Sequence, residues 1–422
     1  MVALRQRLVA SEGGGTFVSL RLHRNYRLFF VGQTISASGS LMQDSALPWL
    51  VLQETHSAFL VGLLVFCRYG PLGVLGLYGG VVADRLDNRR VLMLTQTVAM
   101  VVAVCLSVLA FTHHTPVSAI CVLALIGGLA LAFDNPSKYA LIYQLVGPRE
   151  IANAVSLNLS IQNSARVVGP ALGGVVIAAA GVGWCFVANA LSFVAVLLGL
   201  LLMRSGDVFA PVRTLAHRSV TAALVEGLRF VRQVRDLQIV VALAVVGGLC
   251  GFSAVRTLLP VLARQTLHGG PQTFGALYAA YGAGAVVGAL VSARLGRVSW
   301  LRLLVGGIVF SGTMLLMAPL HDPVIVGMLL CLLGAAWTTW SSQSQVIIQL
   351  AAPDRLRGRL ISVYNSAQFT AVPLGGLAGG WLAGYGGTEL AFSLAGVIGL
   401  SSVIVGYILH ASAKPGIATS AQ

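Results

Sequence analysis

The chain has 422 residues, of which 57% are hydrophobic and only 9% are charged, and its formal net charge is +14. Soluble domains carry about 25% charged residues, so this chain has too few charges to cover a surface that faces water, which excludes a large soluble protein. Its arginines lie in short gaps between apolar runs, a pattern that predicts an integral membrane protein and not a nucleic-acid-binding one.

A membrane-spanning helix needs about 20 mostly apolar residues. Segments of this kind occur at 27–53, 58–83, 90–112, 117–144, 151–180, 183–204, 237–265, 272–294, 300–320, 323–348, 358–384 and 388–411. Turn signals such as Gly147-Pro148 and Gly386-Gly387 separate them. The sequence therefore predicts an all-α integral membrane protein with twelve transmembrane helices in two pseudo-symmetric six-helix bundles.

The longest gap, 205–236, divides the twelve segments into two sets of six. In its second part Leu224, Leu228 and Val231 share one helical face, which predicts an amphipathic helix on the membrane surface; its first part reads equally well as a plain tether. The expected organisation is a tail (1–26), an N-terminal bundle (27–204), a linker (205–236), a C-terminal bundle (237–411) and a second tail (412–422).

Basic residues are distributed unevenly among the gaps. They gather in the N-terminal tail and in every second gap, whereas the alternate gaps hold almost none, and Arg264 is the lone candidate there. Since basic loops mark the cytoplasmic side, we expect both termini and the basic gaps to face the cytoplasm.

The two halves of the chain repeat each other weakly. Pro148 and Pro353, 205 residues apart, each precede charged residues, and the stretch Gly169–Gly174 is echoed by Pro373–Gly376. Duplicated halves in a membrane usually enclose a central site and rock around it, which predicts a transporter.

The gap after the second segment, GGVVADRLDNRR, concentrates charge in a chain that has little of it. Gly80, Asp84 and Arg85, followed by Arg89 and Arg90, resemble the loop motif between helices two and three of the major facilitator superfamily, with Asp87 where that family has its second glycine. Gly169-Pro170 with Gly173-Gly174 resembles the helix-five motif of the family's proton-driven exporters. The runs AFDNPSKYALIYQLV, NSARVVGPALGG and WCFVANALSFVAVLLGL look like the subgroup of enterobactin exporters and related bacterial efflux permeases.

The resemblance implies that the gap after the second segment is a cytoplasmic latch. Asp84 would face the start of helix eleven, where the helix dipole stabilises a carboxylate, and Arg89 or Arg90 would reach Asp134. We expect Asp84→Asn to weaken the latch and reduce transport. The alternative is that Arg85, Arg89 and Arg90 only set the membrane orientation.

The helix-five motif (Gly169, Pro170, Gly173 and Gly174) is expected to be a conformational seal, because small residues let helix backbones approach closely. A packing role alone is the alternative reading.

Ionisable residues inside spanning segments are costly and usually functional. Asp44 and Arg68 each lie twelve residues from His56, so their depths in a helical hairpin match. Because burial and a neighbouring cation have opposite effects on the proton affinity of a carboxylate, we expect this pair to couple transport to protons. A permanent structural ion pair is the competing reading. Asp134 and Lys138, four residues apart, are expected to pair on one helical face.

A central cavity is expected to use the remaining intramembrane arginines, whose excess over acids suits an anionic or catechol-like substrate. Snorkelling arginines and simple aromatic packing are the alternatives. The candidate cavity residues are Arg166, Arg256, Tyr278, Tyr281, Trp337 and Trp340.

The expected function is secondary active, proton-coupled export of a small organic molecule such as a drug or siderophore. A proton-coupled symporter that imports a solute and a non-transporting membrane sensor are the alternatives. Without a nucleotide-binding loop, a nucleophile motif or a metal-ligand cluster in the sequence, we expect no enzyme, cofactor or metal. The expected partners are the substrate, protons and the lipid bilayer, with no nucleic acid, and we expect a monomer.

Overall fold

The computed structural model describes residues 16–112, 116–204, 206, 209, 220–295, 299–353 and 356–412, with only the backbone of Leu77, Gly80, Val81, Asp84, 220–224, Ala293 and Leu295. Over these residues the structure is helical and contains no strand. The expectation that Asp84 faces the start of helix eleven therefore lies outside the described side chains.

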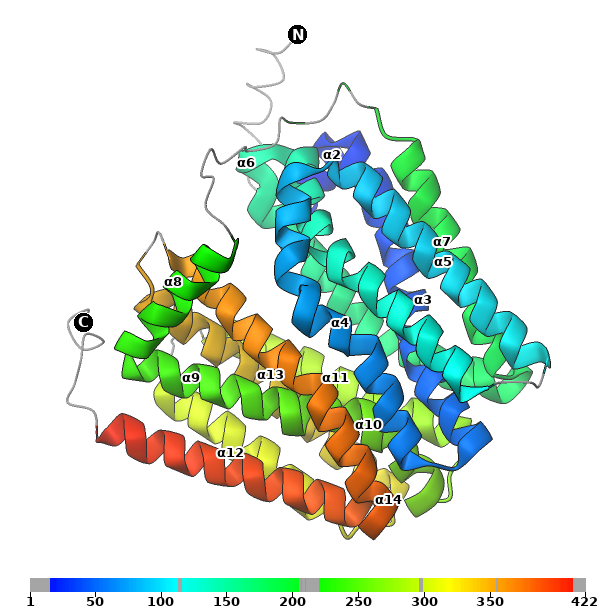
Figure 1. Ribbon diagram of the computed structural model, residues 1–422, viewed down its shortest axis with the longest axis vertical. Helices are drawn as coiled ribbons and strands as arrows, with labels where there is room; N and C mark the ends of the chain where they lie inside the picture. Colours follow the sequence, from blue (N-terminus) through cyan, green and yellow to red (C-terminus); the bar gives the residue numbers. More distant parts are fainter. Residues whose placement is uncertain are drawn as a thin grey trace.

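Two groups of helices lie side by side (Figure 1). The N-terminal group contains α2 (Val18–Leu22), α3 (Arg24–Thr55), α4 (Ala58–Arg85), α5 (Asn88–Thr112), α6 (Val117–Ala180) and α7 (Val182–Leu201). After α8 (Val220–Gln233), the C-terminal group contains α9 (Arg235–Val246), η2 (Gly247–Phe252), α10 (Ser253–Val261), η3 (Leu262–Thr266), α11 (Pro271–Leu295), α12 (Trp300–Met317), α13 (Pro323–Ala351) and α14 (Arg357–Ala411). The segments η2 and η3 are π-helical turns within one continuous rod.

The two longest helices are each broken at a glycine. Gly147 in α6 has φ 73°, and Gly387 in α14 has φ 71°, a left-handed conformation that glycine adopts without steric cost. These breaks fall where the sequence predicts the turns between segments four and five and between segments eleven and twelve.

Within the described chain, nine helices are long and apolar enough to cross a membrane. Dividing α6 and α14 at their breaks and adding α3, which is more polar, yields the twelve expected segments. The count of twelve membrane crossings stays a prediction.

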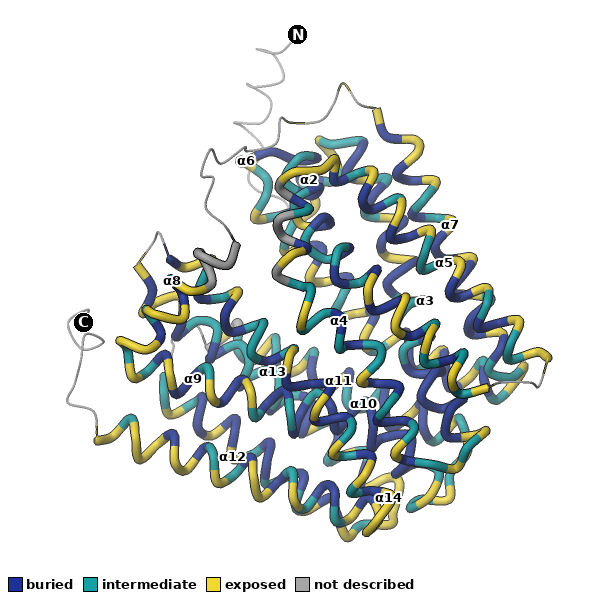
Figure 2. Tube along the Cα trace, in the orientation of Figure 1, coloured by how far each residue is buried: buried dark blue, intermediate teal, exposed yellow. Residues whose placement is uncertain are grey.

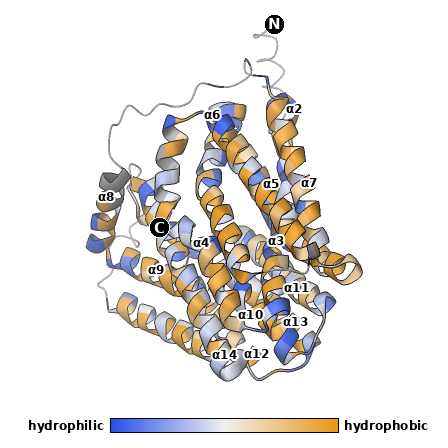
Figure 3. Cartoon of the chain, turned by 45° about the vertical axis from the view of Figure 1, so that its right-hand side comes forward, coloured by the Kyte–Doolittle hydropathy of each residue, from blue (hydrophilic) through white to orange (hydrophobic). Residues whose placement is uncertain are grey.

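Exposed residues recur along these helices (Figure 2), and much of the helical ribbon is hydrophobic (Figure 3). Leu94, Leu290 and Leu301 are each 67% exposed, and many others are similarly uncovered. Surfaces of this extent are not stable in water and match the hydrocarbon interior of a bilayer.

The two groups converge at one end of the molecule and spread apart at the end that carries both termini (Figure 1). In the converging part α4 packs tightly on α14, since a Cβ atom on Gly62 would lie 2.3 Å from the carbonyl oxygen of Gly376. Nearer the termini Gly79 of α4 instead abuts Ala132 and Pro136 of α6, in its own group. The structure is therefore closed at one end and open at the other.

The linker contains a helix, α8, where the sequence predicts an amphipathic one, and it packs on the start of α14; its expected place on the membrane surface stays a prediction. Glu226 pairs with Arg359, and a Cβ atom on Gly227 would lie 3.0 Å from Val363. In this conformation α8 covers the first turns of α14, the part of the chain that the latch hypothesis assigns to Asp84.

Candidate functional site

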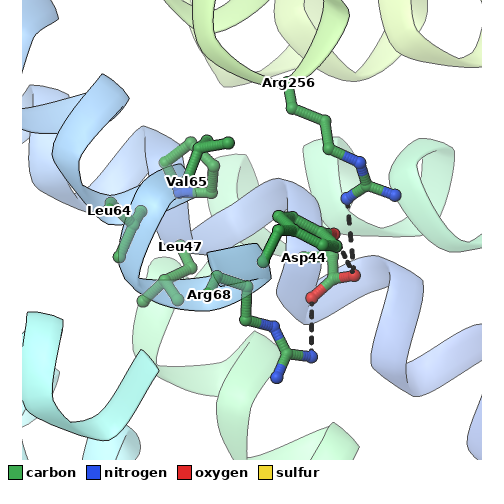
Figure 4. A pocket seen from close by; sticks show the side chains of 8 residues that line it. Asp44, Leu47, Leu64, Val65, Arg68 and Arg256 are labelled. Atoms are coloured by element: carbon green, nitrogen blue, oxygen red, sulfur yellow. Dashed lines mark hydrogen bonds and ion pairs between the residues drawn. The ribbon is translucent and has the colours of Figure 1, made fainter. Parts of the chain in front are cut away.

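A carboxylate lies between two guanidinium groups where the two halves meet (Figure 4). Asp44 Oδ1 is 3.2 Å from Arg68 Nη2, and Asp44 Oδ2 is 3.4 Å from Arg256 Nη1. The hydroxyl of Tyr69 also donates to Asp44 Oδ2, at 3.2 Å. The three charged side chains are only 13–17% exposed, so little water screens their attraction.

The hairpin of α3 and α4 explains half of this cluster. His56 ends α3 in a left-handed conformation (φ 54°), and Ser57 caps α4 by accepting a hydrogen bond from Leu60 N. Equal spacing from His56 then places Asp44 and Arg68 at one depth, as the sequence predicts.

Arg256 comes from the other half, on α10 between the two π-helical turns. Its guanidinium carbon lies 4.8 Å from the ring centre of Tyr69 and 4.6 Å from that of Phe252, so cation–π attraction adds to the ion pair. The sequence predicts Arg256 as a substrate-cavity residue but does not link it to Asp44. Tyr69 and Phe252 are not predicted; their only sequence signal is an aromatic residue beside, or one helical turn from, an arginine.

The cluster borders a small pocket lined also by Leu47, Pro48, Leu64 and Val65. This pocket combines an apolar wall with two cations and one anion. It can hold an anionic group only if that group competes with Asp44 for the arginines.

Arg166, Tyr278 and Tyr281 lie close to this cluster. Arg166 and Arg256 are both within electrostatic range of the two tyrosines, whose ring centres are 6.4 Å apart. Arg166 is exposed and donates to Asn163 Oδ1 at 3.0 Å. Four of the six predicted cavity residues are therefore gathered in one region.

Trp337 and Trp340 are placed differently. Their described ring contacts are with each other and with Phe310, and Trp337 also covers Gly247 and Gly251 of η2. These contacts support the packing alternative for both tryptophans, and their place in a substrate cavity stays a prediction.

Asp134 is buried in a polar network inside the N-terminal half. It accepts hydrogen bonds from Thr95 (2.9 Å) and Gln96 (2.7 Å) and pairs with Lys138 at 3.1 Å. The Lys138 pairing follows the four-residue spacing.

The arginines expected to reach Asp134 bind elsewhere. Arg89 donates to the carbonyl oxygens of Leu200 and Leu201 and so caps the C-terminus of α7, where carbonyls lack helical partners. Arg90 pairs with Asp87 on the surface, and Arg85 is exposed. The expected contact of Arg89 or Arg90 with Asp134 is thus replaced by these interactions; a latch role for the loop stays a proposal.

Replacing Lys138 by methionine is expected to lower the apparent melting temperature of the purified protein. The change leaves a buried carboxylate without its cation, and losing one partner of a buried pair costs about 3–5 kcal/mol. Arg90→Gln is the matched control, because its partner is exposed, and should leave the melting temperature unchanged. A larger fall in melting temperature for Arg90→Gln than for Lys138→Met would show that the Arg90–Asp87 pair, and not the Lys138–Asp134 pair, stabilises the fold.

The helix-five motif faces two neighbours. Cβ atoms on Gly169 and Gly173 would meet α3, the former only 2.8 Å from Leu41 Cβ. A Cβ atom on Gly174 would lie 2.6 Å from Gly275 Cα of α11, in the other half. The motif thus packs within its own group through Gly169 and across the junction through Gly174.

No group of three or more histidine, cysteine, aspartate and glutamate side chains that could hold a metal occurs among the described residues.

Comparisons with known proteins agree with this architecture. A family model described as transmembrane secretion effector matches residues 15–419. The staphyloferrin A transporter of Staphylococcus aureus is 26% identical over 92% of this chain and 97% of its own. The enterobactin exporter EntS of Salmonella paratyphi A is 28% identical over 92% of both chains. The multidrug efflux pump Tap of Mycolicibacterium fortuitum is 27% identical over 86% of this chain and 90% of its own.

Solved structures of transporters share the fold. The nucleoside transporter NupG superposes with a TM-score of 0.73 over 92% of this chain and all of its own, at 12% identity. The D-xylose-proton symporter superposes with a TM-score of 0.72 over 90% of this chain and 97% of its own, at 13% identity. The predicted all-helical major facilitator fold is confirmed, and this multi-pass membrane protein belongs to the transmembrane secretion effector family of the major facilitator superfamily.

Proposed function

We propose that this transporter exports a small organic anion in exchange for protons by alternating access. The observation that carries the proposal is the position of Asp44, which is held by a cation from each half of the molecule. An ionised Asp44 ties α3 and α4 to α10. A proton on Asp44 removes its charge and so releases α10 from α3 and α4, and an anion that takes Arg256 from Asp44 releases α10 in the same way.

The proposed exchange follows from this competition. In the outward step the substrate's anionic group binds Arg256 while Asp44 stays ionised beside Arg68. After the substrate has left on the outer side, a proton from that side neutralises Asp44 for the return step, and it is released to the cytoplasm when Asp44 pairs with Arg256 again. The excess of arginine over acid in this region, with Arg166 nearby, supports an anionic substrate. Relatives named for siderophore and drug export support the outward direction of transport.

The proposed orientation places both termini and the open end of the molecule at the cytoplasm of a bacterial inner membrane, so the structure corresponds to an inward-facing state. The halves 27–204 and 237–411 are proposed to move as bodies, in a monomer. Closing this end would bring α4 toward α14, where α8 now lies.

The proposal is tested in proteoliposomes that carry a pH gradient. A panel of organic anions, organic cations and neutral compounds of similar size is offered on the side that carries the termini. We expect proton movement coupled to the anions, in the direction opposite to theirs. Proton flux in the same direction as the solute would establish a symporter instead, and flux only with cations would refute the anionic substrate.

A further inference from the structure

Arg264 is a basic residue that the proposed exchange does not use. It is the lone candidate basic residue of the gaps expected on the outer side, where basic residues are disfavoured. The π-helical turn η3 (Leu262–Thr266) carries it, and such turns are frequent at functional sites. Both features indicate that Arg264 has a function at the end of the molecule opposite the termini.

Arg264 lines a pocket at the junction of the two halves. Trp49 and Gln53 of α3 form one wall, and His268 and Pro271, from the turn that leads into α11, form another. The guanidinium carbon of Arg264 lies 5.7 Å from the ring centre of Trp49, which itself stacks on Phe274 at 5.2 Å. Trp49 therefore gives the pocket one aromatic wall, and the polar side chains of Gln53, Arg264 and His268 form its rim.

The polar side chains of this rim lack counter-charges. Within the described chain neither Arg264 nor His268 has a carboxylate within 4 Å, and Gln53 makes no hydrogen bond through its side chain. Glu54 follows Gln53 in α3 but does not line the pocket. An arginine, a histidine and an amide thus line the pocket without a hydrogen-bonding side-chain partner among the described residues.

A row of rings connects this pocket to the central site. Trp49, Phe274, Tyr278 and Tyr281 follow one another with centre-to-centre distances of 5.2, 6.0 and 6.4 Å. The last two rings lie within electrostatic range of Arg166 and Arg256. Cations therefore lie at both ends of a largely buried row of rings, three of which belong to α11 and one to α3.

We infer that the pocket at Arg264 is a second binding site for organic anions. A carboxylate or phosphate would pair with Arg264 and accept hydrogen bonds from the Gln53 amide and from a ring nitrogen of His268 that carries a proton. An aromatic ring attached to the anion would pack on Trp49. Its use by the exported molecule on its way out rests on the proposed function; the anion site itself does not.

The site is tested by the charge preference of a thiol placed in it. Gln53→Cys, in nanodiscs of phosphatidylcholine, is treated with anionic sulfonatoethyl and cationic trimethylammonium-ethyl methanethiosulfonate, and the reaction of the parent protein is subtracted. Relative to free mercaptoethanol, the ratio of the anionic to the cationic rate should rise about 25-fold, because one unit charge at ~4 Å in water changes each rate about fivefold and in opposite directions. Adding Arg264→Gln should abolish the preference, whereas adding Glu54→Gln, the matched control, should keep it.

Binding is then measured with 1-naphthoate, a planar aromatic carboxylate. It should slow labelling of Gln53→Cys by a neutral reagent, but not when Arg264→Gln is also present. If labelling of Gln53→Cys is slower in nanodiscs that contain phosphatidylglycerol than in phosphatidylcholine alone, and naphthoate then slows it no further, the bound anion is a lipid headgroup. Equal labelling by both charged reagents, unchanged by Arg264→Gln, would overturn the site. Protection that persists with Asp44→Asn would show that the site stands even if the proposed exchange at Asp44 fails.

Discussion

Asp44→Asn is expected to abolish transport driven by a pH gradient, by at least about 100-fold, the scale of effect typical of removing a proton-transferring group. Asparagine has nearly the same shape: its amide oxygen can accept from Arg68, and its amide nitrogen can donate to the hydroxyl oxygen of Tyr69, where the carboxylate now accepts from both at 3.2 Å. It cannot exchange a proton at neutral pH. Substrate binding and the amount of folded protein should be largely retained.

The measurement is substrate flux in proteoliposomes with and without a pH gradient, together with binding to the purified protein. Asp87→Asn, at an exposed acid on the surface, is the control and should transport at the parental rate. Parental proton-driven transport by Asp44→Asn would eliminate Asp44 as the coupling acid. Loss of folded protein would favour a structural ion pair.

A double substitution separates these two roles further. Asp44→Asn combined with Arg256→Gln removes one positive and one negative charge, so the cluster regains the charge balance that Asp44→Asn alone disturbs. If the pair only stabilises the fold, the double variant should recover both melting temperature and transport. If Asp44 couples protons, it should recover melting temperature alone.

Gly174→Leu is expected to reduce transport at least tenfold by forcing the two halves apart at the closed end. Even a Cβ atom at this position would lie 2.6 Å from Gly275 Cα and 2.9 Å from the carbonyl oxygen of Pro271, and both are backbone atoms that cannot turn away. Overpacking of this kind typically costs about 1–3 kcal/mol. Here the cost falls on the state in which this junction is closed, so the population should shift toward the state open at this end.

The shift is measured by labelling of Gln53→Cys with a bulky maleimide, which should become faster when Gly174→Leu is added. Gly312→Leu is the matched control, since nothing lies within 4 Å of a Cβ atom there. Gly169→Leu, which the sequence alone suggests as the blocking change, should instead lower the melting temperature, because Gly169 packs on α3 within its own half. Unchanged labelling with parental transport in Gly174→Leu would refute a seal at this junction.

The sequence by itself determined the features that depend on one helix or one hairpin. Apolar length predicts the helices, and the breaks at Gly147 and Gly387 fall at turn signals. Spacing around His56 predicts that Asp44 and Arg68 share a depth, and the four-residue interval predicts the pair of Asp134 and Lys138. These relations hold because rise per residue and helical periodicity are properties of the backbone alone.

Only the tertiary structure decided which faces of separate helices meet. Arg256 joins Asp44 from 212 residues away, Arg89 caps α7 instead of reaching Asp134, and Gly174, not Gly169, abuts the other half. Composition and spacing carry no information on how far each helix is rotated about its axis or which helix becomes its neighbour. Those quantities follow from the close packing of all the helices together, which is why the charges could be singled out in advance but their partners could not.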